Sequence, residues 1–195
     1  MDNKFTIAGL AIVGLVAIVL IVGVLWYVGT YNHIITLENT VEEKWAQVEN
    51  QYQRRADLIP NLVNTVKGYA EHEKELFEEV TRMRSQWGEA VKSGDREAQI
   101  QAANGMDSAI SRLLLVAERY PDLKANQNFL ALQSQLEGTE NRIAVERMRY
   151  NEAVRDHNIY IKQIPNSMIA CMMGRMPKEY FEAEEGAEEV PQVEF

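Results

Sequence analysis

An uninterrupted apolar block near the N-terminus constrains this chain more than any other feature. Between residues 5 and 28, 20 of 24 positions are apolar and the others are one threonine and three glycines, so the block carries no charge. In a helix with about 1.5 Å rise per residue, a block of this length spans roughly 36 Å, enough to cross the ~30 Å hydrocarbon core of a bilayer. We therefore predict a membrane-spanning helix over residues 5–29, preceded by a short flank at residues 1–4.

Two other interpretations of this block fit less well. A core helix of a soluble protein rarely runs this long without a charge. A cleaved signal peptide has an apolar region of about 7–15 residues followed by a small-x-small cleavage site, and this sequence has neither feature. Trp26, Tyr27 and Tyr31 lie at the C-terminal end of the block, where aromatic side chains favour the membrane–water interface. We therefore expect an uncleaved, single-pass anchor.

The charges that flank the block indicate its orientation. Lys4 precedes it, whereas the first basic residue after it is Lys44, which follows Glu38, Glu42 and Glu43. Cytoplasmic flanks of membrane spans are enriched in Lys and Arg. The asymmetry, of about one charge, therefore predicts a cytoplasmic N-terminus and a main domain on the other side of the membrane.

The rest of the chain is acidic and strongly charged. The sequence holds 20 basic and 29 acidic residues, all outside the apolar block, for a net charge of −9. This division excludes a simple soluble enzyme, and the single cysteine excludes a disulfide-stapled secreted module. A nucleic-acid-binding protein would need basic patches to neutralise phosphate, so we expect no nucleic-acid partner.

Apolar residues recur at a sevenfold spacing after the block. Two such columns, offset by four residues, form one stripe along a helix, as in the seam of a helical bundle. Only Arg55 and Glu73 interrupt them. The apolar members are Ile34, Val41, Val48, Leu62, Tyr69, Leu76 and Met83 in one column and Trp45, Tyr52, Ile59, Val66, Val80 and Trp87 in the other. The spacing predicts helices packed through this stripe, and the first helix continues from the membrane span.

Prolines and glycines divide this helical region. Pro60 predicts a break or kink around residues 58–59, because proline cannot donate its N–H and crowds the preceding turn. Asp57 is then placed to cap the segment that restarts there. Ser93-Gly94-Asp95 has the composition of a turn.

Two further helices follow this turn. A third is predicted to end near Glu118, and a fourth runs roughly over residues 125–162. Short links force neighbouring helices to be antiparallel. We therefore predict an all-α fold, in which the N-terminal transmembrane helix is followed by an elongated antiparallel up-and-down bundle of about four helices over residues 30–164.

The C-terminal end, residues 165–195, differs in composition from the predicted bundle. A short apolar helix is predicted over residues 168–173, closed by Gly174, and seven glutamates lie between residues 179 and 194. One interpretation is a solvated tail without fixed structure. The alternative is that its apolar side chains dock on the bundle or on a neighbour; these are Tyr180, Phe181, Val193 and Phe195.

The sequence contains none of the common metal, nucleotide or nucleophile motifs, such as HExxH, paired CxxC, GxGxxG or a P-loop. We therefore expect no catalysis, no cofactor and no metal. His72 lies between two glutamates without the spacing of a ligand set, and His33 is expected near the membrane interface. His157 is expected to be a buried residue of the bundle, and Cys171 a small packing residue.

Charged residues on the inner stripe are the best candidates for a specific role. Charges inside a bundle are costly unless paired, so we expect an Arg–carboxylate network. Such a network either sets the register of the helices or forms a ligand or partner site. The candidates on or beside the inner faces are Arg54, Arg55, Asp57, Glu73, Glu140 and Arg147; Pro60 and the tail residues Tyr180, Phe181 and Phe195 complete the set.

Four longer motifs point to a known family. They are RRADLIPNLV at residues 54–63, continuing to VKGY at 66–69, then YPDLKAN at 120–126, LEGTENRI at 136–143 and YN at 150–151. With these motifs the chain resembles the LemA family of bacterial membrane proteins over nearly its whole length. One departure is the methionine-rich stretch 165–176, where the family carries more aliphatic or aromatic residues.

The resemblance implies a single N-terminal span and a helical bundle without established enzymatic activity or cofactor. It also implies association with membranes, because family genes often neighbour those of membrane proteases and a distant member is linked to magnetosome membranes. We therefore expect a scaffold protein of the bacterial inner membrane that contacts the lipid bilayer and forms a homo-oligomer. The alternative is an adaptor or signalling module that binds another membrane protein, such as a membrane protease.

Overall fold

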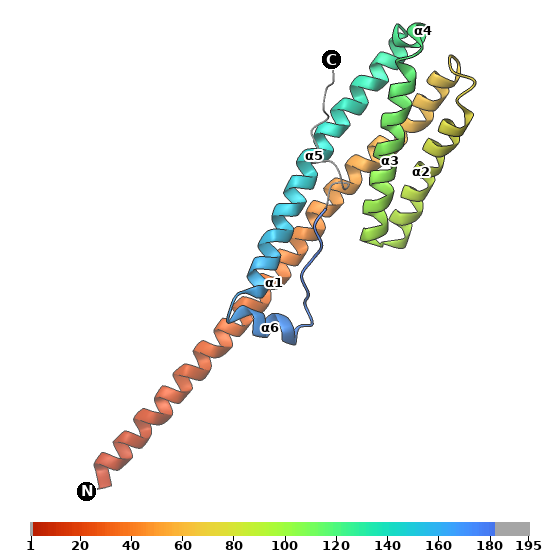
Figure 1. The fold of residues 1–195 in the computed structure, drawn as a ribbon. Coiled ribbons are helices and arrows are strands. Elements are labelled where there is room, and N and C mark those ends of the chain that lie inside the picture. Colours follow the sequence, from red (N-terminus) through yellow and green to blue (C-terminus); the bar gives the residue numbers. More distant parts are fainter. Residues whose placement is uncertain (1, 182–195) are drawn as a thin grey trace, which may run out of the picture. The chain divides into compact units, whose positions relative to one another are not determined.

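The computed structural model describes residues 2–181, with side chains at residue 10 and from residue 12 onward (Figure 1). The described part contains helices and no strand, so the all-α prediction is confirmed. Its helices are α1 (Asp2–Lys67), α2 (Lys74–Ser93), α3 (Arg96–Ala117), α4 (Pro121–Lys124), α5 (Gln127–Lys162) and α6 (Asn166–Met172).

The chain divides into two compact units. The first comprises Met1–Lys44 and Asn151–Glu179, and the second comprises Trp45–Tyr150 and Tyr180–Phe195. Each unit thus contains part of α1 and part of α5.

The N-terminal part of α1 exposes its apolar side chains. α1 is long and apolar enough to cross a membrane, and its most apolar window has a mean hydropathy of 2.7 with no residue buried. Leucine, isoleucine and valine side chains between Leu10 and Val28 are about half to two-thirds exposed. A core helix would instead hide these side chains, so the structure agrees with a membrane protein. α1 also continues without interruption through Gly29 and Thr30, as predicted.

The first unit has its own small core beyond this apolar stretch. Ile34 of α1 and Ile161 of α5 pack with Ile169 and Ala170 of α6, and Tyr160 and Met173 cover the cluster. Figure 1 shows α6 beside the part of α1 that follows the apolar stretch. Cys171 is exposed, so its predicted packing role is wrong: it follows Ala170 by about 100° around α6 and faces outward.

The second unit buries most of the predicted stripe. Leu76 and Met83 are only partly buried, and the prediction is wrong for Tyr69, which is 42% exposed because α1 ends at Lys67 and Tyr69 lies in the turn that follows. On α1 the sevenfold columns are buried from Trp45 to Val66, and their continuation on α2 buries Val80 and Trp87. α3 follows α2 in a hairpin whose turn uses Gly94 at φ 69°. The core side chains from the other helices include Phe77, Ala103, Met106, Ile110, Leu113, Leu123, Phe129, Leu136, Ile143 and Tyr150.

The predicted break at Pro60 is absent, because α1 continues to Lys67 and the chain turns only at Gly68. Proline leaves the carbonyl four residues earlier without its helical donor. That carbonyl belongs to Ala56, and it accepts a hydrogen bond of 3.1 Å from Nε of Arg84 on α2. Asp57 is therefore no helix cap; its carboxylate accepts a hydrogen bond from the Gln53 side chain at 2.9 Å.

Candidate functional site

Arg55 is the buried charge of the second unit. It lies in the inner stripe of α1 between Tyr52 and Ile59, and only 5% of the residue is exposed. Its Nη1 lies 2.8 Å from Oδ1 of Asp107 on α3 and also pairs with Glu140 on α5. An unpaired guanidinium would cost several kcal/mol at such a position. Here two carboxylates from two different helices neutralise it.

Asp107 is the centre of this ion-pair cluster. Its Oδ2 accepts hydrogen bonds from Nη2 of Arg147 at 2.8 Å and from the hydroxyl of Tyr52 at 2.9 Å. The cluster therefore contains two guanidinium groups and two carboxylates, so its formal charges balance. Charge-assisted hydrogen bonds of this kind are directional. The arrangement can set the register of α1, α3 and α5 within the second unit.

Aromatic rings cover the cluster on one side. The guanidinium of Arg147 lies 4.2 Å from the ring centroid of Phe181 and 5.2 Å from that of Tyr52. The Phe181 ring also stacks on Tyr52, with centroids 6.3 Å apart and planes at 5°. Phe181 is only 5% exposed. The docking alternative for the C-terminal end is therefore confirmed for Phe181, whereas Tyr180 is exposed and Val193 and Phe195 lie outside the described residues.

A second cation–aromatic group lies nearby in the same unit. The guanidinium of Arg96 sits 5.0 Å from the ring of Trp45, and the Trp45 ring meets Tyr150 edge-on at 5.1 Å. The indole N–H donates to Oε1 of Gln99 at 2.9 Å. Because cation–π contacts with Trp are among the strongest, this group further ties α1 to α3 and α5.

The structure brings together only part of the predicted set. Arg55, Glu140, Arg147 and Phe181 meet at the ion-pair cluster, whereas Arg54, Asp57 and Pro60 are exposed on α1. Glu73 precedes α2 and lies 3.7 Å from the guanidinium of Arg119, within the same unit but outside the ion-pair cluster.

Sequence reasoning missed Asp107, the carboxylate that joins Arg55, Arg147 and Tyr52. It lies beside Met106, next to the apolar face of α3 but not in it. One signal was available: Asp107 is the only carboxylate between Glu97 and Glu118, in a helix that must pack against a buried arginine. The carboxylate needed by Arg55 could have been sought there.

The first unit contains a separate polar group around His157, which is fully buried as predicted. Its Nδ1 lies 3.2 Å from the Asn158 side chain, and its Nε2 lies 3.9 Å from Glu38, which also pairs with Arg175 at 3.2 Å. The Asn158 amide makes two hydrogen bonds of 2.8 Å to the backbone of Lys178. These contacts hold the segment that follows α6.

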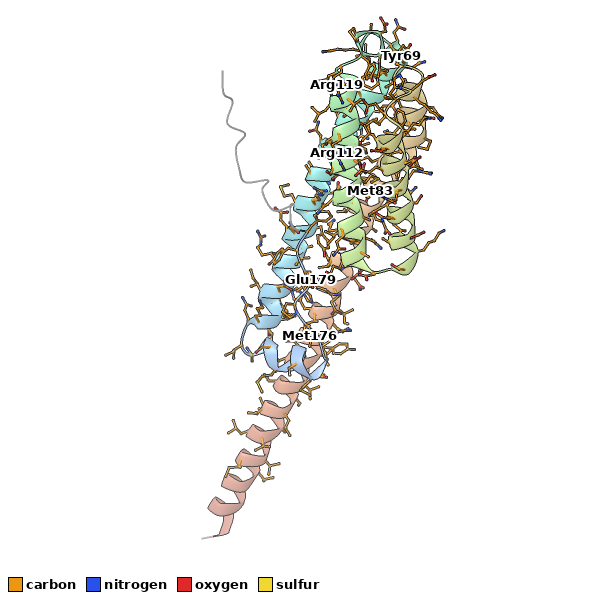
Figure 2. The ribbon with its side chains drawn as sticks, turned by 45° about the vertical axis from the view of Figure 1, so that its right-hand side comes forward. Tyr69, Met83, Arg112, Arg119, Met176 and Glu179 are labelled. Atoms are coloured by element: carbon orange, nitrogen blue, oxygen red, sulfur yellow. The ribbon has the colours of Figure 1, made fainter. Side chains whose placement is uncertain are left out.

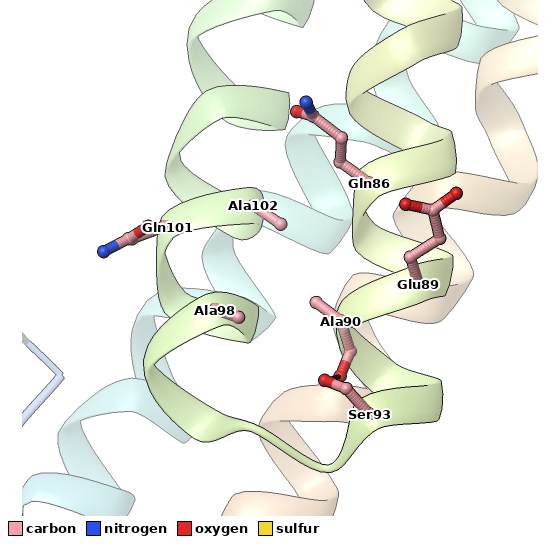
Figure 3. A pocket seen from close by; sticks show the side chains of 7 residues that line it. All are labelled: Gln86, Glu89, Ala90, Ser93, Ala98, Gln101 and Ala102. Carbon is pink, nitrogen blue, oxygen red and sulfur yellow. Dashed lines mark hydrogen bonds between the residues drawn. The ribbon is translucent and has the colours of Figure 1, made fainter.

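One groove of the second unit has few groups that could act chemically. Figure 3 shows this groove of about 410 Å³ between α2 and α3, in which Glu89 is the only ionisable lining residue. Its other lining residues are alanines, glutamines and a serine: Gln86, Ala90, Ser93, Ala98, Gln101 and Ala102. Among residues 2–181, no group of three His, Cys, Asp or Glu side chains has the arrangement of a metal site.

Comparison with known proteins gives a family match over most of the chain. The model of the LemA family matches residues 44–195. Magnetosome protein MamQ 2 of Paramagnetospirillum magneticum is 27% identical over 175 residues, covering 78% of this chain and 64% of its own length. Magnetosome protein MamQ of Magnetospirillum gryphiswaldense is 25% identical over 174 residues, covering 77% and 64% respectively.

Protein LemA of Metamycoplasma hominis is 22% identical over 169 residues, covering 86% of this chain and 76% of its own length. The chain thus spans just under two thirds of the magnetosome relatives and about three quarters of this one. None of these names denotes an enzyme.

Proposed function

We propose that this chain, which belongs to the LemA family, is a membrane-anchored scaffold that assembles with further copies of itself and has no catalytic activity. The exposed apolar part of α1 supports the anchor, because lipid would cover these side chains. The balanced ion-pair cluster supports a structural role for the bundle, since its charged groups bind one another.

The observation that carries self-assembly is an exposed leucine in a charged groove between α2 and α3. Leu115 is 64% exposed and lines a groove of about 490 Å³. Glutamates line the α2 side of this groove. Arg112 and Arg119, which are labelled in Figure 2, line the α3 side. The remaining lining residues are Glu73, Glu75, Leu76, Glu79 and Val116.

A second copy of this groove would share its ion pairs, because within one copy Arg112 already pairs with Glu79 and Arg119 with Glu73. In an isologous dimer the same surface serves on both subunits. A two-fold axis parallel to α2 and α3 would place the carboxylates of one copy opposite the guanidinium groups of the other. The two Leu115 side chains would then meet at the centre, where burying a leucine is worth about 1.5–3 kcal/mol.

The mass of the full-length protein in mild detergents tests the scaffold. We expect a defined oligomer by native mass spectrometry, and Leu115→Asp should reduce it to a monomer, because the carboxylate cannot be buried without a partner. Val145→Asp, at a residue of α5 that is also exposed, is the matched control and should leave the oligomer intact. If the wild-type protein is a monomer in several mild detergents, self-assembly is contradicted.

The competing function is an adaptor that binds another membrane protein, such as a membrane protease. Crosslinking in native membranes separates the two functions. Crosslinks through the α2–α3 groove between copies of this chain support the scaffold. One dominant foreign membrane protein, crosslinked through the same groove without copies of this chain, supports the adaptor.

We further propose a single pass through the bacterial inner membrane, with the bundle on the extracytoplasmic side. The support is the charge asymmetry between Lys4 and the glutamates before Lys44. Protease treatment of intact spheroplasts should digest the bundle. Digestion only after the membrane has been opened would reverse this orientation.

A further inference from the structure

We propose that α6 and its flanking residues form a second membrane contact, in which their exposed apolar side chains insert into the lipid interface beside the spanning helix. Four large apolar side chains, spaced four residues apart, are the starting point. They are Ile164, Met168, Met172 and Met176, which are 88%, 66%, 76% and 78% exposed. Soluble proteins seldom expose so many neighbouring apolar side chains without a partner.

The position of α6 in the first unit identifies that partner as lipid. Ile169 and Ala170 hold α6 against Ile34 of α1. Ile34 lies three residues after Tyr31, which corresponds to about 4.5 Å along the helix. Tyr31 and the preceding Trp26 and Tyr27 are the aromatic residues that we place at the membrane–water interface. α6 therefore lies at the depth at which the proposed anchor leaves the hydrocarbon. Figure 1 shows α6 beside α1, after the N-terminal stretch drawn in red.

The opposite faces of α6 differ as the two sides of an interfacial helix do. One face is buried against α1 and α5, while Met168 and Met172 point away from the protein. A flexible, unbranched methionine adapts to irregular apolar surroundings, and the interface between headgroups and acyl chains is such an environment. Contact with this interface would account for the many methionines of this stretch.

The contact depends on apolar insertion and not on anionic lipid. The basic residues that follow α6 are already paired, Arg175 with Glu38 at 3.2 Å and Lys178 with Glu42 at 3.6 Å. We therefore expect the same insertion in zwitterionic and in anionic bilayers. This inference rests on the membrane anchor of the proposed function but not on self-assembly.

Cys171 provides the probe, because it is the only cysteine of the chain and is exposed on α6. A spin label on Cys171 of the full-length protein in phosphatidylcholine nanodiscs can be probed with two relaxation reagents, oxygen and a nickel chelate. How strongly each reagent affects the label shows whether the label lies in lipid or in water. Oxygen concentrates in lipid, and a water-soluble nickel chelate stays in water. We expect the label to be accessible to oxygen and protected from nickel, and Met168→Ser with Met172→Ser should restore nickel access.

Two reference positions in a Cys171→Ser background make the outcomes distinguishable. Val22→Cys lies in the apolar part of α1, and Asp156→Cys lies on α5 at a residue whose side chain is 58% exposed. If the Val22→Cys label is open to nickel, the anchor itself is wrong. If that label is protected while the Cys171 label matches the Asp156→Cys label, only the second membrane contact is overturned.

Two further results also contradict the proposal. Protection of the Cys171 label from both reagents, with spin–spin broadening between labels, would show that a second copy covers α6. Protection only in nanodiscs that contain phosphatidylglycerol would show that attraction of charges, and not apolar insertion, holds α6 at the membrane.

Discussion

At the scale of single residues, the second unit depends on one carboxylate that serves three helices. Asp107 on α3 is paired with Arg55 from α1 and Arg147 from α5, and it also accepts the Tyr52 hydroxyl. Arg55 is the most buried of the four charged groups in the cluster, with 6% of its side chain exposed. Its charge can stay in the core only while its carboxylate partners remain in place.

Removing this carboxylate should destabilise the protein strongly. We expect Asp107→Ala to lower the free energy of unfolding by about 3 kcal/mol, because Arg55 stays buried with one partner fewer. Chemical denaturation of the full chain in detergent, followed by circular dichroism, measures the change. Arg54→Ala removes an exposed neighbouring charge and should change stability by less than about 0.5 kcal/mol. Similar losses in both variants would contradict the role of Asp107.

The site could be predicted only in part, because the burial of some of its residues follows from their own helix and that of others depends on a neighbouring helix. Arg55 interrupts an apolar column, so its own helix marks it as buried. Asp107 lies beside an apolar face, where a carboxylate reaches either water or a neighbouring helix. Which of the two it reaches depends on the rotation of α3 against α1, and sevenfold spacing carries no information on that rotation.

At the scale of elements, α1 tolerates a proline in its interior because another helix replaces the lost hydrogen bond. Pro60 leaves the Ala56 carbonyl without its helical donor, and Arg84 of α2 donates to that carbonyl. Ala56 is buried, so water cannot readily satisfy this oxygen. Pro60, which by local rules predicts a break in the helix, thus leaves a carbonyl free for a hydrogen bond that joins α1 to α2.

A double-mutant cycle tests this tie. We expect Arg84→Ala to cost about 1–2 kcal/mol of unfolding free energy in the native sequence, because the Ala56 carbonyl is left unsatisfied. In a Pro60→Ala background the cost should be smaller, because the restored N–H at position 60 donates to the same carbonyl. Equal costs in the two backgrounds, measured by chemical denaturation, would show that the Arg84 hydrogen bond does not compensate for the proline.

The α2–α3 hairpin offers a matched pair of glycine substitutions. Gly88 lies within α2, and a Cβ there meets no atom within 4 Å, so Gly88→Ala should stabilise by about 0.5–1 kcal/mol. Gly94 closes the hairpin turn at φ 69°, where a side chain is strained, so Gly94→Ala should destabilise by about 1–2 kcal/mol. The two melting temperatures should therefore shift in opposite directions, and a shift of the same sign would contradict the assignment of the turn.

At the scale of the whole molecule, the apolar part of α1 differs from the residues that follow it in what surrounds its side chains. Side chains from residue 12 to 28 are exposed, whereas Ile34 is fully buried in the core of the first unit. In the proposed anchor, lipid would surround the first group, whereas protein surrounds Ile34. The apolar part of α1 should therefore hold the protein at the membrane and add little to the free energy of unfolding.

Truncation separates these contributions. We expect a chain without residues 1–28 to keep the melting temperature of the full-length protein in the same detergent, because the described side chains among those removed, at residues 10 and 12–28, are exposed. A deletion extended through Ile34 should lower the melting temperature, since it removes a core side chain. A lower melting temperature in the shorter deletion would mean that the anchor also supports the fold.

The sequence by itself determined that α1 begins with an uncharged apolar stretch, because its length and composition are local. It also determined the helical class and most of the buried stripe, because both follow from which residues recur on one face of a helix. It also marked Arg55 as a charge in need of a partner. Only the tertiary structure decided that Asp107 supplies this partner, that Arg84 rescues Pro60, that Phe181 docks and that Cys171 faces outward. These four outcomes depend on the rotation and register of helices distant in sequence, and packing of the complete core sets both.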